Sequence, residues 1–134
     1  MDTLSPVALP LRQPRWMTIL GWILTVPPAF MFIVGGIFAA LSPQQMNDAL
    51  PKLGWPLDVA PYIIALEIVC GLLYLFPKTA TLGAILLTAY LGGAVATHVR
   101  VHDPMAAVPI AFGIILWLAL YLRDPRLRQI ALWR

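Results

Sequence analysis

Charged residues are scarce in this sequence of 134 residues: Asp, Glu, Lys and Arg make up 11% of it, whereas hydrophobic residues make up 60%. A soluble domain carries charges at about a quarter of its positions. The scarcity therefore excludes an ordinary soluble domain and indicates an integral membrane protein. In such a protein the placement of the charges matters more than the net charge of +3, and we predict no nucleic-acid partner.

Cysteine is nearly absent too, since Cys70 is the only one in the sequence. A single cysteine excludes an intrachain disulfide and a CxxC pair, which argues against a disulfide-exchange enzyme. A catalytic thiolate would need a nearby cation or base, and none is evident near Cys70, which we interpret as a small apolar core residue. The sequence also lacks a P-loop, a dinucleotide-binding fingerprint and an HExxH motif.

Four apolar runs are long enough to cross a bilayer, for which about 20 residues suffice. They cover residues 16–41, 58–77, 79–99 and 105–122. Because they lack the alternation of a membrane barrel, we predict an all-α transmembrane four-helix bundle. A three-span arrangement, with the first run cleaved or re-entrant, is the alternative, and it would put the termini on opposite faces.

The polar stretch SPQQMNDALPKLGWPL, residues 42–57, separates the first two runs. Met46, Leu50 and Leu53 share one face of a helix that would begin at Pro43. We therefore predict a short amphipathic segment that lies on the membrane surface or folds over the end of the bundle. A plain connector is the alternative.

Basic residues are distributed unevenly between the two sides of this four-span arrangement. Two of them, Lys52 and Arg100, fall on one side, and seven fall on the other: Arg12, Arg15, Lys78, Arg123, Arg126, Arg128 and Arg134. Cytoplasmic loops carry the excess of Lys and Arg. We therefore predict a bacterial inner-membrane protein whose N-terminal tail (residues 1–15) and basic C-terminal tail (residues 123–134) are both cytoplasmic.

Glu67 lies near the middle of the second run. An ionised carboxylate at that depth costs about 3 kcal/mol or more, so such a residue usually faces protein or a cavity and marks a site. We counted residues outward from the predicted turns to find what lies at the same depth. The layer holds Pro27, Pro28, Glu67, Thr88, Tyr90 and Trp117.

No Lys or Arg lies in this layer, so burial favours the protonated form of Glu67. We expect it to hydrogen-bond Tyr90, Thr88 or a backbone carbonyl that the two prolines leave without a donor. Two interpretations remain open. Either Glu67, Thr88, Tyr90 and Trp117 line a pocket for a ligand, or the polar groups only tie helices together.

A second polar cluster, of His98, Arg100, His102 and Asp103, ends the third run. The two histidines have the spacing of residues that share a metal, but a third ligand is not evident, and we predict no metal site. We expect Arg100 to pair with Asp103, Asp58 or a lipid phosphate. His98 would lie about 15 Å along the helix axis from the Glu67 layer, where it could line a path toward it.

Small residues recur at a spacing of four in the third run, in the pairs Gly92 and Ala96, and Ala89 and Gly93. Such pairs let helices approach each other closely in lipid. We expect this face to pack against another helix of the bundle. The same face could also join copies of the chain in a homo-oligomer.

The segments KLGWP, ALEIVCGLLYLFPKTATLGAILLTAYLGGAVATHVRVHDP and LWLALYLRDPRLR together resemble the DoxX-like membrane proteins. The resemblance covers roughly residues 17–128. Glu67, the glycine-rich third run and its ending at Thr97, His98 and Arg100 carry most of it. It implies a small four-helix membrane protein, and some members of the family are associated with oxidoreductase complexes, thiosulfate-to-quinone electron transfer or defence against oxidative stress.

The resemblance implies a subunit that binds a lipophilic molecule, with a quinone as the candidate cofactor, next to a soluble or membrane redox partner. Glu67 and Tyr90 would lie near the lipophile, with Glu67 as hydrogen-bond donor or proton relay. A second hypothesis is a small membrane enzyme with Glu67 as general acid, assisted by Tyr90 or His98. A third is an assembly factor whose polar residues only specify packing.

Overall fold

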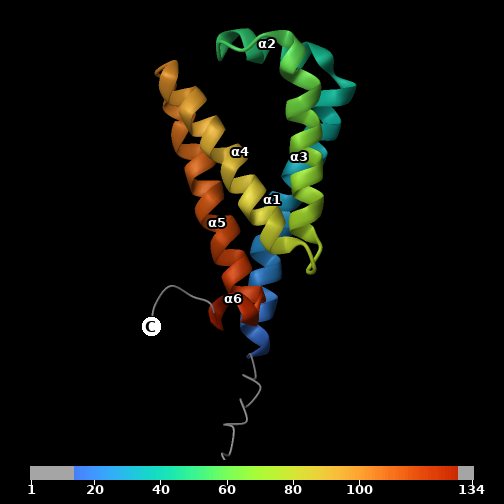
Figure 1. The fold of residues 1–134 in the computed structure, drawn as a ribbon, viewed down its shortest axis with the longest axis vertical. Coiled ribbons are helices and arrows are strands. Elements are labelled where there is room, and N and C mark those ends of the chain that lie inside the picture. Colours follow the sequence, from blue (N-terminus) through green and yellow to red (C-terminus); the bar gives the residue numbers. More distant parts are fainter. Residues whose placement is uncertain (1–13, 130–134) are drawn as a thin grey trace, which may run out of the picture.

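The computed structural model describes residues 14–129. These residues form the helices α1 (Arg15–Leu41), α2 (Pro43–Lys52), α3 (Ala60–Leu75), α4 (Ala80–Arg100), α5 (Ala107–Arg123) and α6 (Pro125–Gln129) (Figure 1). Two short 3-10 turns, Leu57–Val59 and Pro104–Ala106, lead into α3 and α5. Within this described part of the chain, four helices, built on α1, α3, α4 and α5, are long and apolar enough to cross a membrane. This confirms the predicted all-α four-helix bundle.

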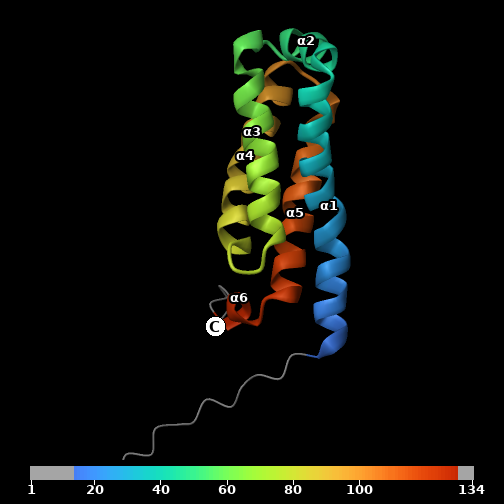
Figure 2. The ribbon, with the colours of Figure 1, turned by 90° about the vertical axis from the view of Figure 1, so that its right-hand side faces the viewer.

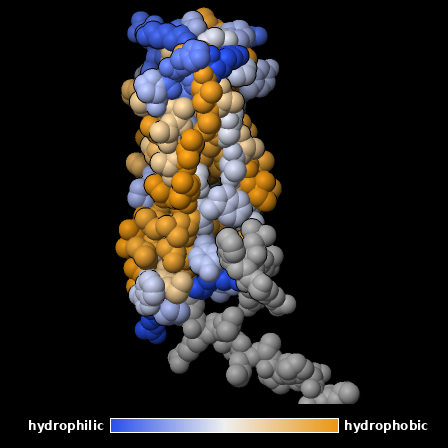
Figure 3. All heavy atoms as spheres, turned by 90° about the vertical axis from the view of Figure 1, so that its left-hand side faces the viewer, coloured by the Kyte–Doolittle hydropathy of each residue, from blue (hydrophilic) through white to orange (hydrophobic). Residues whose placement is uncertain are grey.

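The four long helices form a ring in which α1 packs against α3 and α5, and α4 packs against the same two helices. The start of α1, the α3–α4 turn and α6 lie at one end of the bundle, which we call the α6 end (Figures 1 and 2). The α4–α5 turn and α2 lie at the opposite end, which we call the α2 end. Figure 3 shows hydrophilic residues gathered at the α2 end and hydrophobic residues over much of the long helices.

Helix α2 lies across the α2 end rather than trailing between the spans (Figure 1). Its apolar face is turned inward, since Leu50 is 4% exposed while Met46 is half-buried. Just after the helix, the carbonyl oxygen of Leu53 accepts a hydrogen bond of 2.8 Å from Nη2 of Arg100, at the end of α4. These contacts favour the predicted amphipathic segment folded over the bundle end and argue against a plain connector.

Three glycines lie where neighbouring helices cross most closely. They are Gly21 of α1 against α5, Gly36 of α1 against α3, and Gly83 of α4 against α3; a fourth, Gly71 of α3, lies against α1. A Cβ atom at Gly83 would lie 2.3 Å from the backbone nitrogen of Tyr74. In lipid, where helices gain little from excluding apolar surface from water, such close approach is a main source of stability.

The predicted packing of the small residues in α4 was wrong. A Cβ atom at Gly92 or Gly93 would meet no other atom within 4 Å, and Ala89 and Ala96 are exposed. The reason is the rotation of α4 about its axis: its buried side carries Ala80, Gly83, Ala84, Leu87 and Leu91, so the predicted small residues lie off that side. A homo-oligomer built on this outward face stays a prediction.

Candidate functional site

The Tyr90 hydroxyl of α4 donates a hydrogen bond to Oε1 of Glu67 on α3. The close crossing at Gly83 positions this pair. Glu67 is seven residues before Tyr74, and Tyr90 is seven residues after Gly83, the residue that meets Tyr74. Seven residues make about two helical turns. Glu67 and Tyr90 therefore lie at the same distance from the crossing, on the facing sides of the two antiparallel helices. Of the partners expected for Glu67, the structure selects Tyr90.

Aromatic packing fixes the direction of the Tyr90 ring. Phe32 of α1 lies edge-on to it, with ring centroids 6.1 Å apart, and also packs edge-on against Phe112 of α5 at 6.0 Å. The Tyr90 hydroxyl thus bonds Oε1 of Glu67, while Oε2 has no hydrogen-bond partner within the described part of the chain. Glu67 is half-buried, so this second carboxyl oxygen is the polar atom available to a ligand.

The other two predicted residues form a separate pair. Nε1 of Trp117 on α5 donates to Oγ1 of Thr88 on α4 at 2.8 Å, and the Thr88 hydroxyl donates to the carbonyl of Ala84 at 2.7 Å. Residues two apart on a helix point about 160° to 200° away from each other. Thr88 and Tyr90 therefore face different sides of α4, and the four residues form two pairs at one depth.

A groove of about 520 Å³ between α4 and α5 adjoins this second pair. Thr88 and Trp117 line it together with Gly92 and Gly113, whose missing side chains leave the space, and its remaining lining residues are apolar. Neither Glu67 nor Tyr90 is part of its wall. The groove and the Glu67–Tyr90 pair are thus two distinct candidate binding places.

His98 is occupied at the α2 end. Its Nδ1 lies 2.9 Å from Oδ2 of Asp103, while the other oxygen of Asp103 accepts a 2.9 Å hydrogen bond from the backbone N–H of Met105. Both hydrogen bonds lower the pKa of Asp103, and the bond from the Met105 N–H has the larger effect. Eight residues separate His98 from Tyr90, or about 12 Å along the helix, so His98 does not join the Glu67–Tyr90 pair.

Of the partners predicted for Arg100, neither Asp103 nor Asp58 forms an ion pair with it among the described residues. His98 takes Asp103, whereas the Arg100 guanidinium bonds the carbonyls of Leu53 and Gly54 and lies 5.6 Å from the Trp55 ring centroid. Arg100 follows His98 by two positions and so points to the other side of α4. Across residues 14–129, no group of three His, Cys, Asp or Glu side chains could hold a metal ion.

Arg123 was predicted only as a charge that sets the orientation, but it is buried in the structure. The residue is 8% exposed, and Nη2 donates to the carbonyl oxygen of Tyr74. The guanidinium carbon lies 4.8 Å from the Trp22 ring centroid and 4.9 Å from that of Tyr74. The signal in the sequence was a basic residue joined directly to the last apolar run, LWLALYLR.

The fold and these sites define a class: a small membrane protein of four spanning helices, with hydrogen-bonded polar pairs between the spans and a buried cation at one end. The model of the DoxX-like family matches residues 23–120. The match covers most of the chain, and the protein belongs to this family. No curated protein and no solved structure matches the chain.

Proposed function

We propose that this protein binds a lipophilic molecule of the quinone type within the membrane, as a binding or accessory subunit of a membrane redox system. The observation that carries the proposal is the Glu67–Tyr90 pair between two spanning helices, with Oε2 of Glu67 left without a partner among the described residues. A protonated carboxyl donates one hydrogen bond. A quinone carbonyl accepts one, and its apolar tail is soluble among lipid chains.

The same pair suits a step that moves protons. Reduction of a quinone to a quinol takes up two electrons and two protons, and a carboxyl next to a ring oxygen supplies a route for one proton. Tyr90 stabilises the carboxylate that this transfer leaves behind, because its hydroxyl already donates to Oε1. The electrons come from a redox partner, in keeping with an accessory role for this chain.

The groove between α4 and α5 offers a different chemistry. The Thr88 hydroxyl donates a hydrogen bond to the Ala84 carbonyl and accepts one from Trp117. One of its two lone pairs is then still able to accept a hydrogen bond. That lone pair suits a ligand hydroxyl, such as that of a quinol or another lipophilic alcohol. Since the groove and Glu67 lie on different sides of α4, substitutions can separate the two places.

We predict that a quinone or another isoprenoid co-purifies with the protein and that Glu67→Ala lowers its amount per protein at least about tenfold. The loss follows because the alanine removes the one carboxyl donor between these spans. The measurement is organic extraction of protein purified in mild detergent, followed by mass spectrometry. Glu67→Gln keeps the shape of the side chain and an acceptor for Tyr90, so it separates loss of the acid from loss of packing.

Asp58→Asn is the matched control, because it removes an exposed carboxylate just before α3 on the same span. It should leave the extracted ligand unchanged. Loss of the ligand in Trp117→Phe but not in Glu67→Ala would move the site to the groove. Bulk phospholipid alone, unchanged by any of these substitutions, would contradict the proposal and favour a purely structural role for Glu67.

A second candidate function is a small membrane enzyme that acts directly on a lipophilic substrate. The Glu67–Tyr90 hydrogen bond favours it, because a phenol that stabilises the conjugate base assists a general acid. His98, held by Asp103 at the α2 end, has no part in it. Turnover by the purified chain alone would support the enzyme, whereas turnover only with a redox partner would support the accessory subunit.

We further propose that the α6 end faces the cytoplasm of a bacterial inner membrane. The basic residues at this end are Arg15, Lys78, Arg123, Arg126 and Arg128 (Figure 1). Lys52 and Arg100 end α2 and α4 at the opposite end, while Arg12 and Arg134 lie outside the described residues. This excess is the one expected of a cytoplasmic face.

Cysteine labelling of intact spheroplasts tests this orientation. A membrane-impermeant maleimide should label Lys52→Cys from outside and label Lys78→Cys only after the membrane is permeabilised. Both positions are exposed, so access to the reagent depends on the side of the membrane alone. The native Cys70 is buried and serves as the unlabelled background. The reverse pattern would refute the orientation.

A further inference from the structure

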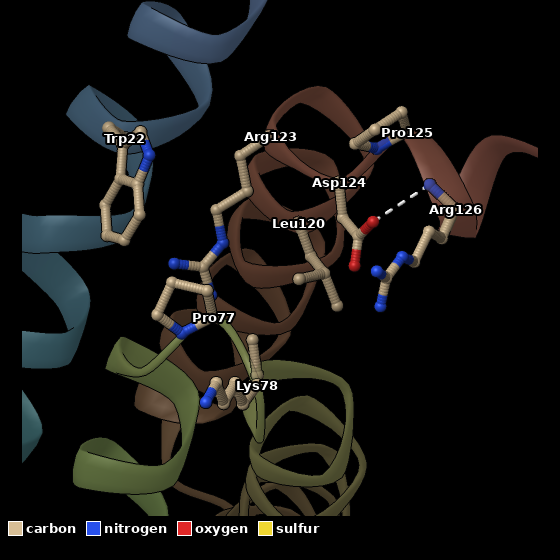
Figure 4. A pocket seen from close by; sticks show the side chains of 9 residues that line it. Trp22, Pro77, Lys78, Leu120, Arg123, Asp124, Pro125 and Arg126 are labelled. Carbon is tan, nitrogen blue, oxygen red and sulfur yellow. Dashed lines mark hydrogen bonds between the residues drawn. The ribbon is translucent and has the colours of Figure 1, made fainter. Parts of the chain in front are cut away.

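A second cavity, of about 370 Å³, opens at the α6 end, away from both the Glu67–Tyr90 pair and the groove. Its wall combines Trp22 of α1, the α3–α4 turn at Pro77 and Lys78, the end of α5 at Arg123, and the start of α6 at Arg126 (Figure 4). Three segments that are distant in the sequence thus enclose one space: α1, the α3–α4 turn, and the end of α5 with the start of α6. The fold, and not a local motif, builds it.

Arg123 is the buried group in this wall. The residue is more than nine-tenths buried, and Figure 4 shows the guanidinium between Trp22 and Pro77, two other residues of the wall. Nη2 donates to the Tyr74 carbonyl, but Nη1 has no hydrogen-bond partner among the described residues. Two aromatic rings flank the guanidinium. A buried guanidinium nitrogen without a hydrogen-bond acceptor is costly, so an arrangement of this kind indicates a missing acceptor.

The remaining charges do not supply that acceptor. Lys78 and Arg126 add two more cations, and Asp124 is the single acidic residue that residues 14–129 contribute to the wall. Oδ1 of Asp124 accepts a 2.9 Å hydrogen bond from the backbone N–H of Arg126, which Figure 4 marks with a dashed line. Asp124 forms no ion pair with Arg123 in the described part of the chain. Three cations against one anion leave the cavity positively charged.

We propose that this cavity is an anion site that takes a phosphate group. Phosphate oxygens match the planar donors of a guanidinium, and Lys78 and Arg126 reach a phosphate as flexible cations from the exposed rim. The cavity lies where the spans end, which is the depth of lipid phosphates. The phosphate is that of an anionic lipid headgroup or of a soluble phosphate, and both present the same chemistry to Arg123.

The test measures the thermal unfolding midpoint of the full chain in dodecyl maltoside, since a ligand that binds the folded state raises the midpoint. The probes are inorganic phosphate, phosphatidylglycerol in mixed micelles, and phosphatidylcholine, whose cationic choline weakens its binding near Lys78 and Arg126. We expect phosphate or phosphatidylglycerol to raise the midpoint at concentrations at least tenfold lower than phosphatidylcholine does. A response to phosphatidylglycerol alone identifies the headgroup, and a response to inorganic phosphate alone identifies a soluble phosphate.

Substitutions decide whether this cavity is the place of binding. Lys78→Gln and Arg126→Gln alter exposed side chains and should each weaken binding of the responding probe at least threefold, and together at least tenfold. Lys52→Gln, at the α2 end, is the matched control and should change nothing. Arg123→Lys keeps the positive charge but lacks the planar set of guanidinium N–H donors, so it should also weaken binding. No response to either anionic probe, or equal responses in the double variant and the parent protein, would overturn the proposal.

Discussion

Gly83→Ala is expected to destabilise the bundle by about 3 kcal/mol, at the upper end of the usual cost of overpacking. The added Cβ would lie 2.3 Å from the backbone nitrogen of Tyr74, 2.5 Å from its Cα and 2.7 Å from the carbonyl carbon of Leu73. These are backbone atoms, which cannot rotate away as a side chain does. The methyl group is accommodated only if α3 and α4 separate along their crossing.

Gly93→Ala is the matched control, on the same helix and with the same chemical change. A Cβ there meets no atom within 4 Å, and alanine is the better helix former, so this variant should be more stable by roughly 0.5 to 1 kcal/mol. Unfolding in mixed detergent and dodecyl sulfate micelles, followed by circular dichroism, measures both. The two effects have opposite signs. Equal effects would mean that α3 and α4 do not cross at Gly83.

The same variant bears on function because the crossing sets the distance between Glu67 and Tyr90. Two helical turns separate the crossing from the pair, so a separation of α3 and α4 also moves the Tyr90 hydroxyl away from the carboxyl. If Glu67 binds a lipophile, Gly83→Ala lowers the amount that co-purifies even in the fraction that folds. Gly93→Ala leaves it unchanged.

The spans were predictable from the sequence because the bilayer leaves few alternatives. Every backbone polar group in lipid needs an internal partner, so long apolar runs form helices. The Glu67–Tyr90 bond was within reach of the same reasoning. The turn at Pro77 and Lys78 is short, which makes α3 and α4 antiparallel neighbours, and residues at equal distances from it come to the same depth.

Depth was predictable, but direction around a helix was not. Thr88 lies two residues from Tyr90 and at nearly the same depth, yet it faces α5 and bonds Trp117. Counting from turns cannot give the rotation of α4, which depends on where its close crossing falls. That crossing is at Gly83, and the sequence offers Gly92 and Gly93 as equal candidates. Since lipid chains and helix interiors are both apolar, composition does not distinguish the two faces.

Arg123 was missed for a related reason. A basic residue at the end of a span usually extends its charged end toward water, so the sequence assigns it to the surface. Here the guanidinium lies instead beside the rings of Trp22 and Tyr74 and donates a hydrogen bond to the Tyr74 carbonyl. These partners lie on α1 and α3, far from Arg123 in the sequence, and only the folded ring of helices brings them to one place.

Tyr74→Ala is expected to destabilise the protein by about 4 kcal/mol, as for other large buried aromatic residues truncated to alanine. Tyr74 is fully buried, and its hydroxyl donates to the carbonyl oxygen of Leu116 at 2.8 Å. This bond joins α3 to α5 across the ring of helices. Truncation leaves a cavity where three elements meet: α3, α5 and the glycine crossing of α4.

Tyr74→Phe separates packing from hydrogen bonding. It keeps the ring and removes only the hydroxyl, so it should cost about 1 kcal/mol. Tyr62→Ala is the control on the same helix, because Tyr62 is 75% exposed and its truncation leaves no cavity. The measurement is the same detergent unfolding. A cost for Tyr74→Ala no larger than for Tyr62→Ala would show that Tyr74 does not occupy the core.

Tyr74 also links stability to the phosphate site proposed at the α6 end. Its ring is one of the two that flank the Arg123 guanidinium, and its carbonyl accepts the bond from Nη2. Tyr74→Phe keeps both contacts, so it should bind the phosphate probe as the parent protein does despite its lower stability. Tyr74→Ala removes one ring and frees Arg123 to change position, so binding should weaken along with folding. If Tyr74→Phe instead bound the phosphate probe more weakly, the hydrogen bond from the Tyr74 hydroxyl to Leu116 would be needed to position Arg123.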